Sequence, residues 1–326
     1  MNPKIYQVAF LGSDEIALPL LQCFESLTPN CKLSAVLTQP DRPAGRGRKI
    51  QPNPIKSWAI EKKLPIAYPA KPGLQEIEWF KDLGIDLLLV MAYGHILKEE
   101  MLSSTRFGCF NLHASLLPAY RGASPIESAL ASGEAETGVT FMRVIRKMDA
   151  GPILDFEKVT IEKEEVGLSL RKKISLACIP LIERTLKKIL SGNFGESTQN
   201  ESSISYCRKL NKSDAILDFS MNAKSLDCRI RAFKGWPGSV FIHREISISV
   251  GSTTPLYEDF SLEPGEVRQD SEGRLLVGTS DGNLRFDELQ KPGGRMIRSE
   301  EFLRGYDLPT GSKLKIIQCN APLVNK

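Results

Sequence analysis

The first 190 residues alternate between short apolar runs and stretches in which apolar residues recur at helical spacing. Continuous apolar runs of this length are typical of parallel strands that are buried on both faces. We expect strands over residues 6–12, 32–39, 86–92, 107–113, 137–145 and 152–161. We expect helices over residues 14–27, 53–63, 126–133 and 167–192. This alternation predicts an α/β fold with a doubly wound, mostly parallel sheet and right-handed crossovers.

The pattern changes after residue 190. Residues 191–205 are rich in Ser, Gly and Asn and poor in large apolar side chains, which is typical of a linker. After a short helical stretch at 223–233, brief strands over 239–250, 265–290 and 313–318 are separated by Gly, Pro and Asp. Such closely spaced short strands predict a small β-barrel. We therefore expect an α/β domain at 1–190, a linker at 191–205 and a barrel domain at 206–326.

The composition narrows the class of protein. The chain has 326 residues, of which 41% are hydrophobic and 25% charged, as is usual for a globular protein. No apolar run is long enough to span a membrane, and the N-terminus does not resemble a signal peptide, so we expect a cytoplasmic protein. The seven cysteines form no C-x-x-C pair, and we expect neither a metal site nor a disulfide scaffold. The net charge of +4 permits a nucleic-acid partner without arguing for one.

Asn111 and His113 are the strongest candidates for a functional site. They are two residues apart at the end of a predicted strand, so their side chains lie on the same side of the sheet. In open α/β sheets, ligands bind beyond the carboxyl ends of the strands. An amide N–H and an imidazole N–H there can both donate to an oxygen that becomes an oxyanion. The alternative is a histidine that is simply hydrogen-bonded to neighbouring backbone.

Asp149 lies in an Asp-Ala-Gly-Pro turn between two predicted strands. Aspartate is a common turn former, so a purely local role is one interpretation. A carboxylate that reaches His113 would instead favour the protonated imidazole and fix its orientation. His95 and His243, the other two histidines, are expected to be structural or peripheral.

Residues 39–54 form a long basic insertion between a predicted strand and a predicted helix. Arg42, Arg46, Arg48 and Lys49 are interspersed with glycine and proline, so we expect a segment without regular structure that holds its cations in water. Charge alone leaves two interpretations open, a solvated surface loop or a flexible loop that closes on phosphates. The first strand-to-helix turn has one glycine and therefore lacks a dinucleotide-binding fingerprint.

The stretch NLHASLLPAYRGASPI (111–126), followed by MDAGPI (148–153), resembles the signature of the formyltetrahydrofolate-dependent transferase family. The resemblance implies a Rossmann-like catalytic domain and an OB-like C-terminal barrel. It implies a catalytic set made of Asn111, His113 and Asp149. The folate contacts that it implies are Ser115, Leu116, Leu117 and Pro118, together with Val90, Met91, Ala92 and Tyr93 in the segment VMAYGHIL.

Two further resemblances narrow the substrate. The basic stretch DRPAGRGRKIQPNPIK (41–56) resembles the insertion loop of the family members that formylate methionine on initiator tRNA. The stretches at 230–241 and 289–305 resemble the C-terminal barrel of the same members, and the likeness runs from Ile5 to about Gly305. The tRNA contacts that this implies are Arg42, Arg46, Arg48 and Lys49. The opening turn, FLGSDEIALPLL, departs from the Thr-Pro-Phe type of sequence that these members have after the glycine.

The implied reaction moves the formyl group of 10-formyltetrahydrofolate to the α-amino group of methionine on initiator tRNA, without a metal, in a protein that we expect to be a monomer. In this reaction Asn111 and protonated His113 stabilise the formyl oxyanion, and Asp149 orients His113 and assists proton removal. One alternative is a formyltransferase that acts on a nucleotide or amino-sugar amine. The other is a non-catalytic RNA-binding protein, which would have no use for Asn111 and His113 in register.

Overall fold

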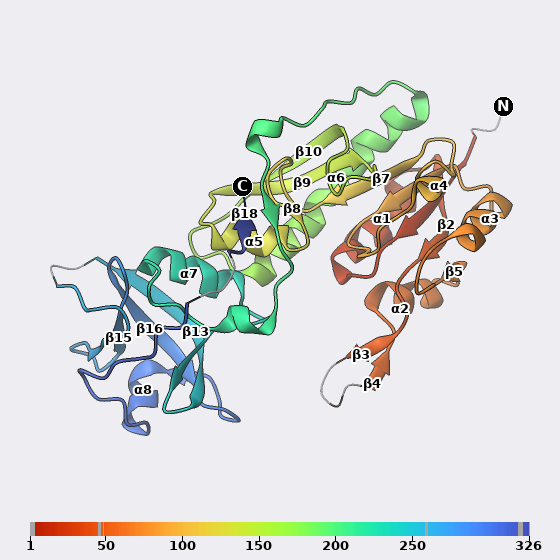
Figure 1. Ribbon diagram of the computed structural model, residues 1–326. Coiled ribbons are helices and arrows are strands. Elements are labelled where there is room, and N and C mark those ends of the chain that lie inside the picture. The colour runs from red at the N-terminus through yellow and green to blue at the C-terminus, as the bar shows by residue number, and fades with distance from the viewer. Residues whose placement is uncertain (1–3, 45–46, 48, 258–259, 319–321, 326) are drawn as a thin grey trace. The chain divides into compact units, whose positions relative to one another are not determined.

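The computed structural model of the chain describes residues 4–44, 47, 49–257, 260–318 and 322–325 (Figure 1). The chain divides into two units. Unit 1 comprises Met1–Gly122, Glu136–Thr160 and Arg171–Tyr206, and unit 2 comprises Ala123–Ala135, Ile161–Leu170 and Cys207–Lys326. No helix of the described residues is long and apolar enough to cross a membrane.

Unit 1 is built on a seven-stranded sheet with the order β10-β9-β7-β6-β1-β2-β5. Its strands are β1 (Tyr6–Leu11), β2 (Cys31–Leu37), β5 (Ile66–Ala67), β6 (Leu87–Val90), β7 (Cys109–His113), β9 (Glu136–Arg143) and β10 (Ile153–Thr160). The five strands from β5 to β7 run parallel, while β9 pairs antiparallel with both β7 and β10. The predicted mostly parallel sheet is confirmed.

Both faces of this sheet are buried. The helical segments of unit 1 are η1 (Glu15–Ala17), α1 (Leu18–Leu27), α2 (Pro54–Glu61), α3 (Leu74–Asp82), α4 (Glu99–Leu102) and most of α6 (Gly167–Ser191). Side chains of α3 and α4 pack with Ala9 and Leu11 of β1 in one core cluster. Val8 and Phe10 point to the other face and are equally inaccessible to solvent. The sheet is therefore covered on both sides, as a doubly wound fold requires.

Unit 2 contains an antiparallel sheet with the order β12-β13-β16-β15-β14, extended by β17. Its strands are β12 (Val240–His243), β13 (Ile246–Leu256), β14 (Val267–Gln269), β15 (Leu275–Gly278), β16 (Asn283–Gln290) and β17 (Ile297–Arg298). Its helices are α5 (Pro125–Ala131), α7 (Ala223–Ala232) and α8 (Ser299–Arg304). The curled sheet fits the small barrel that we predicted.

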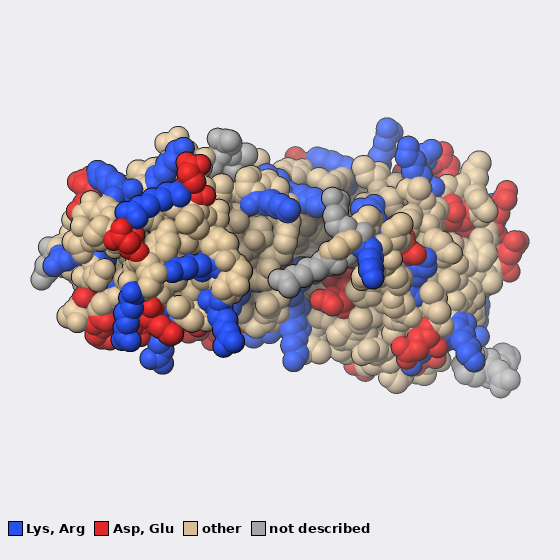
Figure 2. Space-filling view, turned by 90° about the horizontal axis from the view of Figure 1, so that it is seen from below, with Lys and Arg blue, Asp and Glu red and all other residues tan. Residues whose placement is uncertain are grey.

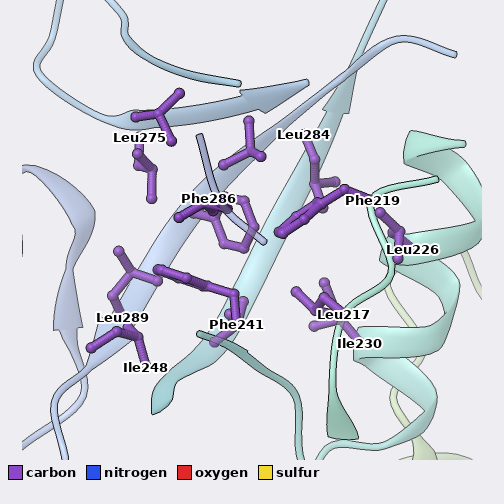
Figure 3. Close-up of a cluster of buried hydrophobic side chains, with 14 of the residues drawn as sticks. Leu217, Phe219, Leu226, Ile230, Phe241, Ile248, Leu275, Leu284, Phe286 and Leu289 are labelled. Atoms are coloured by element: carbon purple, nitrogen blue, oxygen red, sulfur yellow. The ribbon is translucent and has the colours of Figure 1, made fainter. Parts of the chain in front are cut away.

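The core of unit 2 is aromatic and aliphatic. Figure 3 shows Phe286 of β16 beside Phe219 and Phe241, and both contacts are edge-to-face. Leu226 and Ile230 of α7 belong to the same buried cluster. The strand expected at 313–318 is wrong, because that segment makes only an isolated bridge from Lys313 to Glu266.

Short elements complete the chain. They are β8 (Arg121–Gly122), η2 (Glu201–Ser203), β11 (Tyr206–Cys207), η3 (Lys212–Ala215) and β18 (Val324–Asn325).

Candidate active site

The side chains of Asn111 and His113 lie on one side of β7. The strand carries Asn111 opposite Val90 of β6 and Met142 of β9, and it ends at His113, opposite Thr140. The alternate residues of the strand, Phe110 and Leu112, are buried on the opposite side. The Asn111 side chain is half-buried and makes no hydrogen bond with any described residue. Its amide is thus available to a ligand.

His113 is held from one side and faces a carboxylate on the other. Its side chain is only 6% exposed. Nε2 lies 2.9 Å from the carbonyl oxygen of Tyr120. A carbonyl only accepts, so Nε2 carries a proton and donates it to Tyr120. Nδ1 lies 3.7 Å from Oδ2 of Asp149. The nitrogen that can act on a substrate is therefore Nδ1.

Asp149 adopts an unusual backbone conformation. Its φ is +48°, in the left-handed region that L-residues other than Asn and Asp rarely adopt. Its Oδ2 accepts a hydrogen bond of 2.9 Å from the backbone N–H of Gly122. This bond and the approach to His113 converge on the same oxygen. The turn therefore directs the carboxylate at the imidazole, and the two residues meet although they are far apart in sequence.

The loop after β7 is held by internal hydrogen bonds. The hydroxyl of Ser115 donates to the carbonyl of Ala119 at 2.6 Å. Thr140 donates to the carbonyl of Ser115 at 2.6 Å and accepts from the N–H of Leu117 at 3.0 Å. Ser115 and Leu117 are buried, while Leu116 and Pro118 are partly exposed. Of these four predicted folate contacts, the two partly exposed residues are the more accessible to a ligand.

The second predicted folate segment follows β6. Val90, Met91 and Tyr93 are buried, and Ala92 is exposed with a φ of +48°. The backbone carbonyl of Tyr93 accepts a hydrogen bond of 2.6 Å from Gln39. Its hydroxyl is buried with no hydrogen-bond partner among the described residues, and burial raises the pKa of that hydroxyl.

The basic insertion has regular structure, which corrects the sequence prediction. Strands β3 (Arg42–Ala44) and β4 (Lys49–Gln51) pair antiparallel, Arg42 opposite Gln51 and Ala44 opposite Lys49. The pairing supplies the backbone hydrogen bonds that a short extended segment needs, and Pro43 is tolerated because a two-stranded ribbon has open edges. We call residues 42–51 the basic hairpin. Arg42 and Lys49 are exposed, whereas Arg46 and Arg48 lie outside the described residues.

Arg42 acts electrostatically on the segment after β6. Burial lowers the pKa of His95, and the positive charge of Arg42 lowers it further. The Nε2 atom of His95 is buried and has no hydrogen-bond partner in the described part of the chain. Gln39, just before the basic hairpin, is hydrogen-bonded to the carbonyl of Tyr93, so the start of the hairpin is close to this segment.

Much of the positive charge of unit 2 is neutralised locally. In Figure 2, Lys and Arg side chains are interspersed with Asp and Glu side chains across the face shown. Several arginines of unit 2 are in ion pairs, namely Arg208 with Asp214, Arg231 with Asp227, Arg244 with Asp307, Arg274 with Asp270 and Arg285 with Asp287. Within the residues described, no group of three or more His, Cys, Asp or Glu side chains is arranged to hold a metal ion.

Three residues that support the site, Tyr120, Thr140 and Gln199, were not predicted from the sequence. Tyr120 and Thr140 act through a backbone carbonyl and a short hydroxyl, which leave no recognisable pattern in sequence. Gln199 was assigned to a linker because its neighbours are small and polar. Its side chain is nevertheless buried.

The fold agrees with what comparison with known proteins finds. Residues 6–177 match the formyl transferase family, and residues 209–307 match the formyl transferase C-terminal domain. This chain belongs to the formyl transferase family.

Relatives over nearly the whole length are named methionyl-tRNA formyltransferase. The protein from Methylococcus capsulatus is 38% identical over 93% of this chain and 97% of its own length. The protein from Sulfurihydrogenibium is 34% identical over 95% of this chain and 100% of its own. Among solved structures, the N-formyltransferase of Helicobacter canadensis, crystallised with folinic acid and dTDP-3-aminofucose, has a TM-score of 0.64 at 18% identity. It covers 86% of this chain and 99% of its own, which shows a shared fold.

Proposed function

We propose that this chain transfers the formyl group of 10-formyltetrahydrofolate to the α-amino group of methionine on initiator tRNA. The proposal is supported by full-length relatives of that name and by the geometry at the end of β7. The observation that carries it is the combination of an unbonded Asn111 amide with a His113 Nδ1 that faces Asp149. We place the reaction in the cytoplasm. The monomeric state stays a prediction.

Asn111, His113 and Asp149 have different roles in the acyl transfer. As the amine nitrogen bonds to the formyl carbon, negative charge develops on the formyl oxygen. The Asn111 amide and the protonated Nδ1 of His113 donate hydrogen bonds to that oxygen. Asp149, whose Oδ2 faces Nδ1, orients the imidazole beside the substrate and receives the amine proton through water. The bond from the formyl carbon to the folate nitrogen then breaks, and that nitrogen takes up the proton that Asp149 received from the amine.

The folate and tRNA contacts complete the proposal. We assign the folate to the loop with Ser115, Leu116, Leu117 and Pro118 and to the segment from Val90 to Tyr93, whose first residue, Val90, pairs with Asn111 in the sheet. We assign tRNA phosphates to the basic hairpin, with Arg42 and Lys49 exposed on its strands. The barrel of unit 2 adds further contacts to the tRNA. We also propose that residues 1–190 form the catalytic domain, residues 191–205 a linker and residues 206–326 the tRNA-binding domain.

A sugar formyltransferase is the second candidate, because solved structures of this fold include sugar N-formyltransferases. One of them, a sugar 3N-formyl transferase, has a TM-score of 0.63 at 17% identity. Relatives named for tRNA are about twice as similar in sequence and contain both domains. The tRNA substrate is therefore the stronger candidate.

The test is to supply the formyl donor with either initiator methionyl-tRNA or a dTDP-amino sugar and to measure release of tetrahydrofolate. We expect release only with the tRNA. Asn111→Ala and His113→Ala should each lower kcat by roughly 100- to 1,000-fold, which is typical for the loss of one oxyanion donor. Asn193→Ala, an exposed asparagine elsewhere in unit 1, serves as the control. Release with the sugar alone would reject the proposal, and native turnover in Asn111→Ala would reject the assigned site.

A further inference from the structure

The segment from Ser197 to Ser205 binds to both loops of the candidate active site. Ser197 pairs with Ile153 through two backbone hydrogen bonds of 2.8 Å, just beyond the turn that contains Asp149. At the other end, Ser205 accepts a hydrogen bond from the N–H of Tyr120 through its hydroxyl at 2.9 Å. Its carbonyl accepts from the N–H of Arg121 at 2.8 Å. A segment with these bonds is an ordered part of unit 1.

The side chain of Gln199 is only 6% exposed, whereas those of its neighbours Thr198 and Asn200 are exposed. Its Nε2 donates to the carbonyl of Asp149 at 2.9 Å and to that of Gly151 at 2.8 Å. Its Oε1 accepts from Nε of Arg121 at 3.1 Å and from Nη2 at 2.6 Å. Every hydrogen-bonding group of the amide is thus in use, as a buried polar side chain requires.

Arg121 is 2% exposed and has no carboxylate within 4 Å among the described residues. The partners of its guanidinium are Gln199 and, at 3.3 Å, the hydroxyl of Tyr206. On either side of it in the chain lie the two backbone groups that touch the catalytic pair. The carbonyl of Tyr120 binds His113, and the N–H of Gly122 binds Asp149. Arg121 therefore ties both of these groups to Gln199.

The turn from Asp149 to Gly151 needs external support. Asp149 has a positive φ, a backbone conformation that a residue other than glycine keeps only where the surrounding structure supports it. At Gly151, a Cβ would lie 1.8 Å from the carbonyl oxygen of Arg143, so the turn packs against β9 without room for a side chain. The two carbonyls that Gln199 binds are at the two ends of this turn.

We infer that Gln199 and Arg121 are positioning residues that set the geometry between His113 and Asp149. The amide of Gln199 holds the turn that contains Asp149. The guanidinium of Arg121, in the loop that binds His113, is hydrogen-bonded to the same amide. The inference rests on the proposed function for its effect on catalysis. Its structural content, a dependence of the His113 environment on residue 199, does not depend on which substrate is formylated.

The consequence for the reaction is specific. Acyl transfer depends on the placement of the catalytic groups to within a fraction of an ångström, and a misplacement of about 1 Å can lower the rate by about 100-fold. The amide of Gln199 is fully engaged within the chain, so it has no hydrogen-bonding group left for either proposed substrate. Loosening it should therefore lower kcat and leave the KM values for folate and tRNA near their native values.

The test is Gln199→Glu. The carboxylate keeps a favourable partner for Arg121, so the chain should still fold. It loses the two N–H donors and places oxygen against the carbonyls of Asp149 and Gly151. We expect kcat to fall by about 10- to 100-fold at nearly constant KM. Gln22→Glu, on the exposed side of α1, makes the same chemical change without these contacts and should behave as the native chain.

A second measurement separates this inference from the proposed function. The chain has only three histidines, so the imidazole nitrogen signals can be assigned by NMR. We expect the His113 signals to move in Gln199→Glu and to stay in place in Gln22→Glu, whether or not the tRNA is the substrate. Unchanged His113 signals in Gln199→Glu would overturn the inference. Unchanged kcat in an enzyme that is active on tRNA would also overturn it and leave the proposed function standing. An inactive native chain with shifted His113 signals would instead reject only the proposed function.

Discussion

At the scale of single residues, the roles in the candidate site follow from which hydrogen-bonding groups are already in use. Nε2 of His113 is committed to Tyr120, and the hydroxyl of Ser115 is committed to Ala119. The Asn111 amide has no partner among the described residues, and Nδ1 of His113 faces Asp149. The groups that are left for a substrate are thus the two that we assign to the oxyanion.

Part of this site could be predicted from sequence, and the physical reasons are clear. A period of two along a strand places Asn111 and His113 on one side with no further information. The position of Asp149 depends on a turn with positive φ, which composition does not reveal. Gln199 was missed because burial of a polar side chain depends on distant partners, here Asp149 and Arg121.

The electrostatic effect of Arg42 on His95 yields a prediction at this scale. In Arg42→Ala the pKa of His95 should rise, because a positive charge that disfavours the imidazolium is removed. It should stay below the ordinary value of about 6.5, because burial, the larger cause, remains. At neutral pH His95 is thus neutral in both proteins, and the difference is seen as a titration that moves to higher pH. NMR titration of the histidine signals measures it.

Lys49→Ala is the matched control for this variant, since it removes a positive charge from the other strand of the basic hairpin. It should leave the titration of His95 nearly unchanged. In binding experiments with initiator tRNA, each variant should reduce the dependence of log affinity on log salt by about one unit or less. If the pKa of His95 is the same in Arg42→Ala as in the native chain, the two side chains do not interact in solution.

At the scale of elements, the regular parts of the fold were predictable and the short ones were not. Four uncharged apolar residues, 87–90, are buried on both faces as β6, and a long amphipathic pattern becomes α6. Helices α3 and α4 were not predicted. The basic hairpin was predicted to lack regular structure, because glycine and proline weigh against long strands but do not prevent a ribbon of three residue pairs.

Asn53 connects the basic hairpin to α2. Its Oδ1 accepts from the N–H of Lys56, as an N-cap does, and from the hydroxyl of Thr38. Its Nδ2 donates to the carbonyl of Gln39 at 3.0 Å. One side chain therefore caps the helix and joins the two ends of the insertion.

We predict that Asn53→Ala lowers the free energy of unfolding by about 1–2 kcal/mol, which is typical for the loss of an N-cap. Asn53→Asp keeps both acceptor functions and loses the donor to Gln39, so it should recover part of this loss. Urea denaturation of the two variants measures the difference. Asn222→Asp is the control, because Asn222 caps α7 through its oxygen alone. Equal losses for Asn53→Ala and Asn53→Asp would show that capping contributes little.

At the scale of the whole molecule, the chain passes between the two units several times. Unit 2 takes in residues 123–135 and 161–170 as well as everything after residue 206. The predicted boundaries at 190 and 206 rest on a change of composition, and composition cannot show which helix packs with which sheet. Helix α5, which lies early in the chain, packs with α7, which lies a hundred residues later. Both belong to unit 2.

This connectivity predicts that a fragment of residues 1–206 is less stable than its length suggests. Without α7, the side chains of α5 that are buried in the full chain, including Ile126, Ala129 and Leu130, lose part of their cover. Exposed apolar surface of this kind favours association and binds hydrophobic dyes. We expect the fragment to bind such a dye and to melt below the full chain. Ile126→Ser and Leu130→Ser in the fragment should reduce dye binding. A fragment that has the same melting temperature as the full chain and binds no dye would show that α5 does not need α7 to cover its apolar side chains.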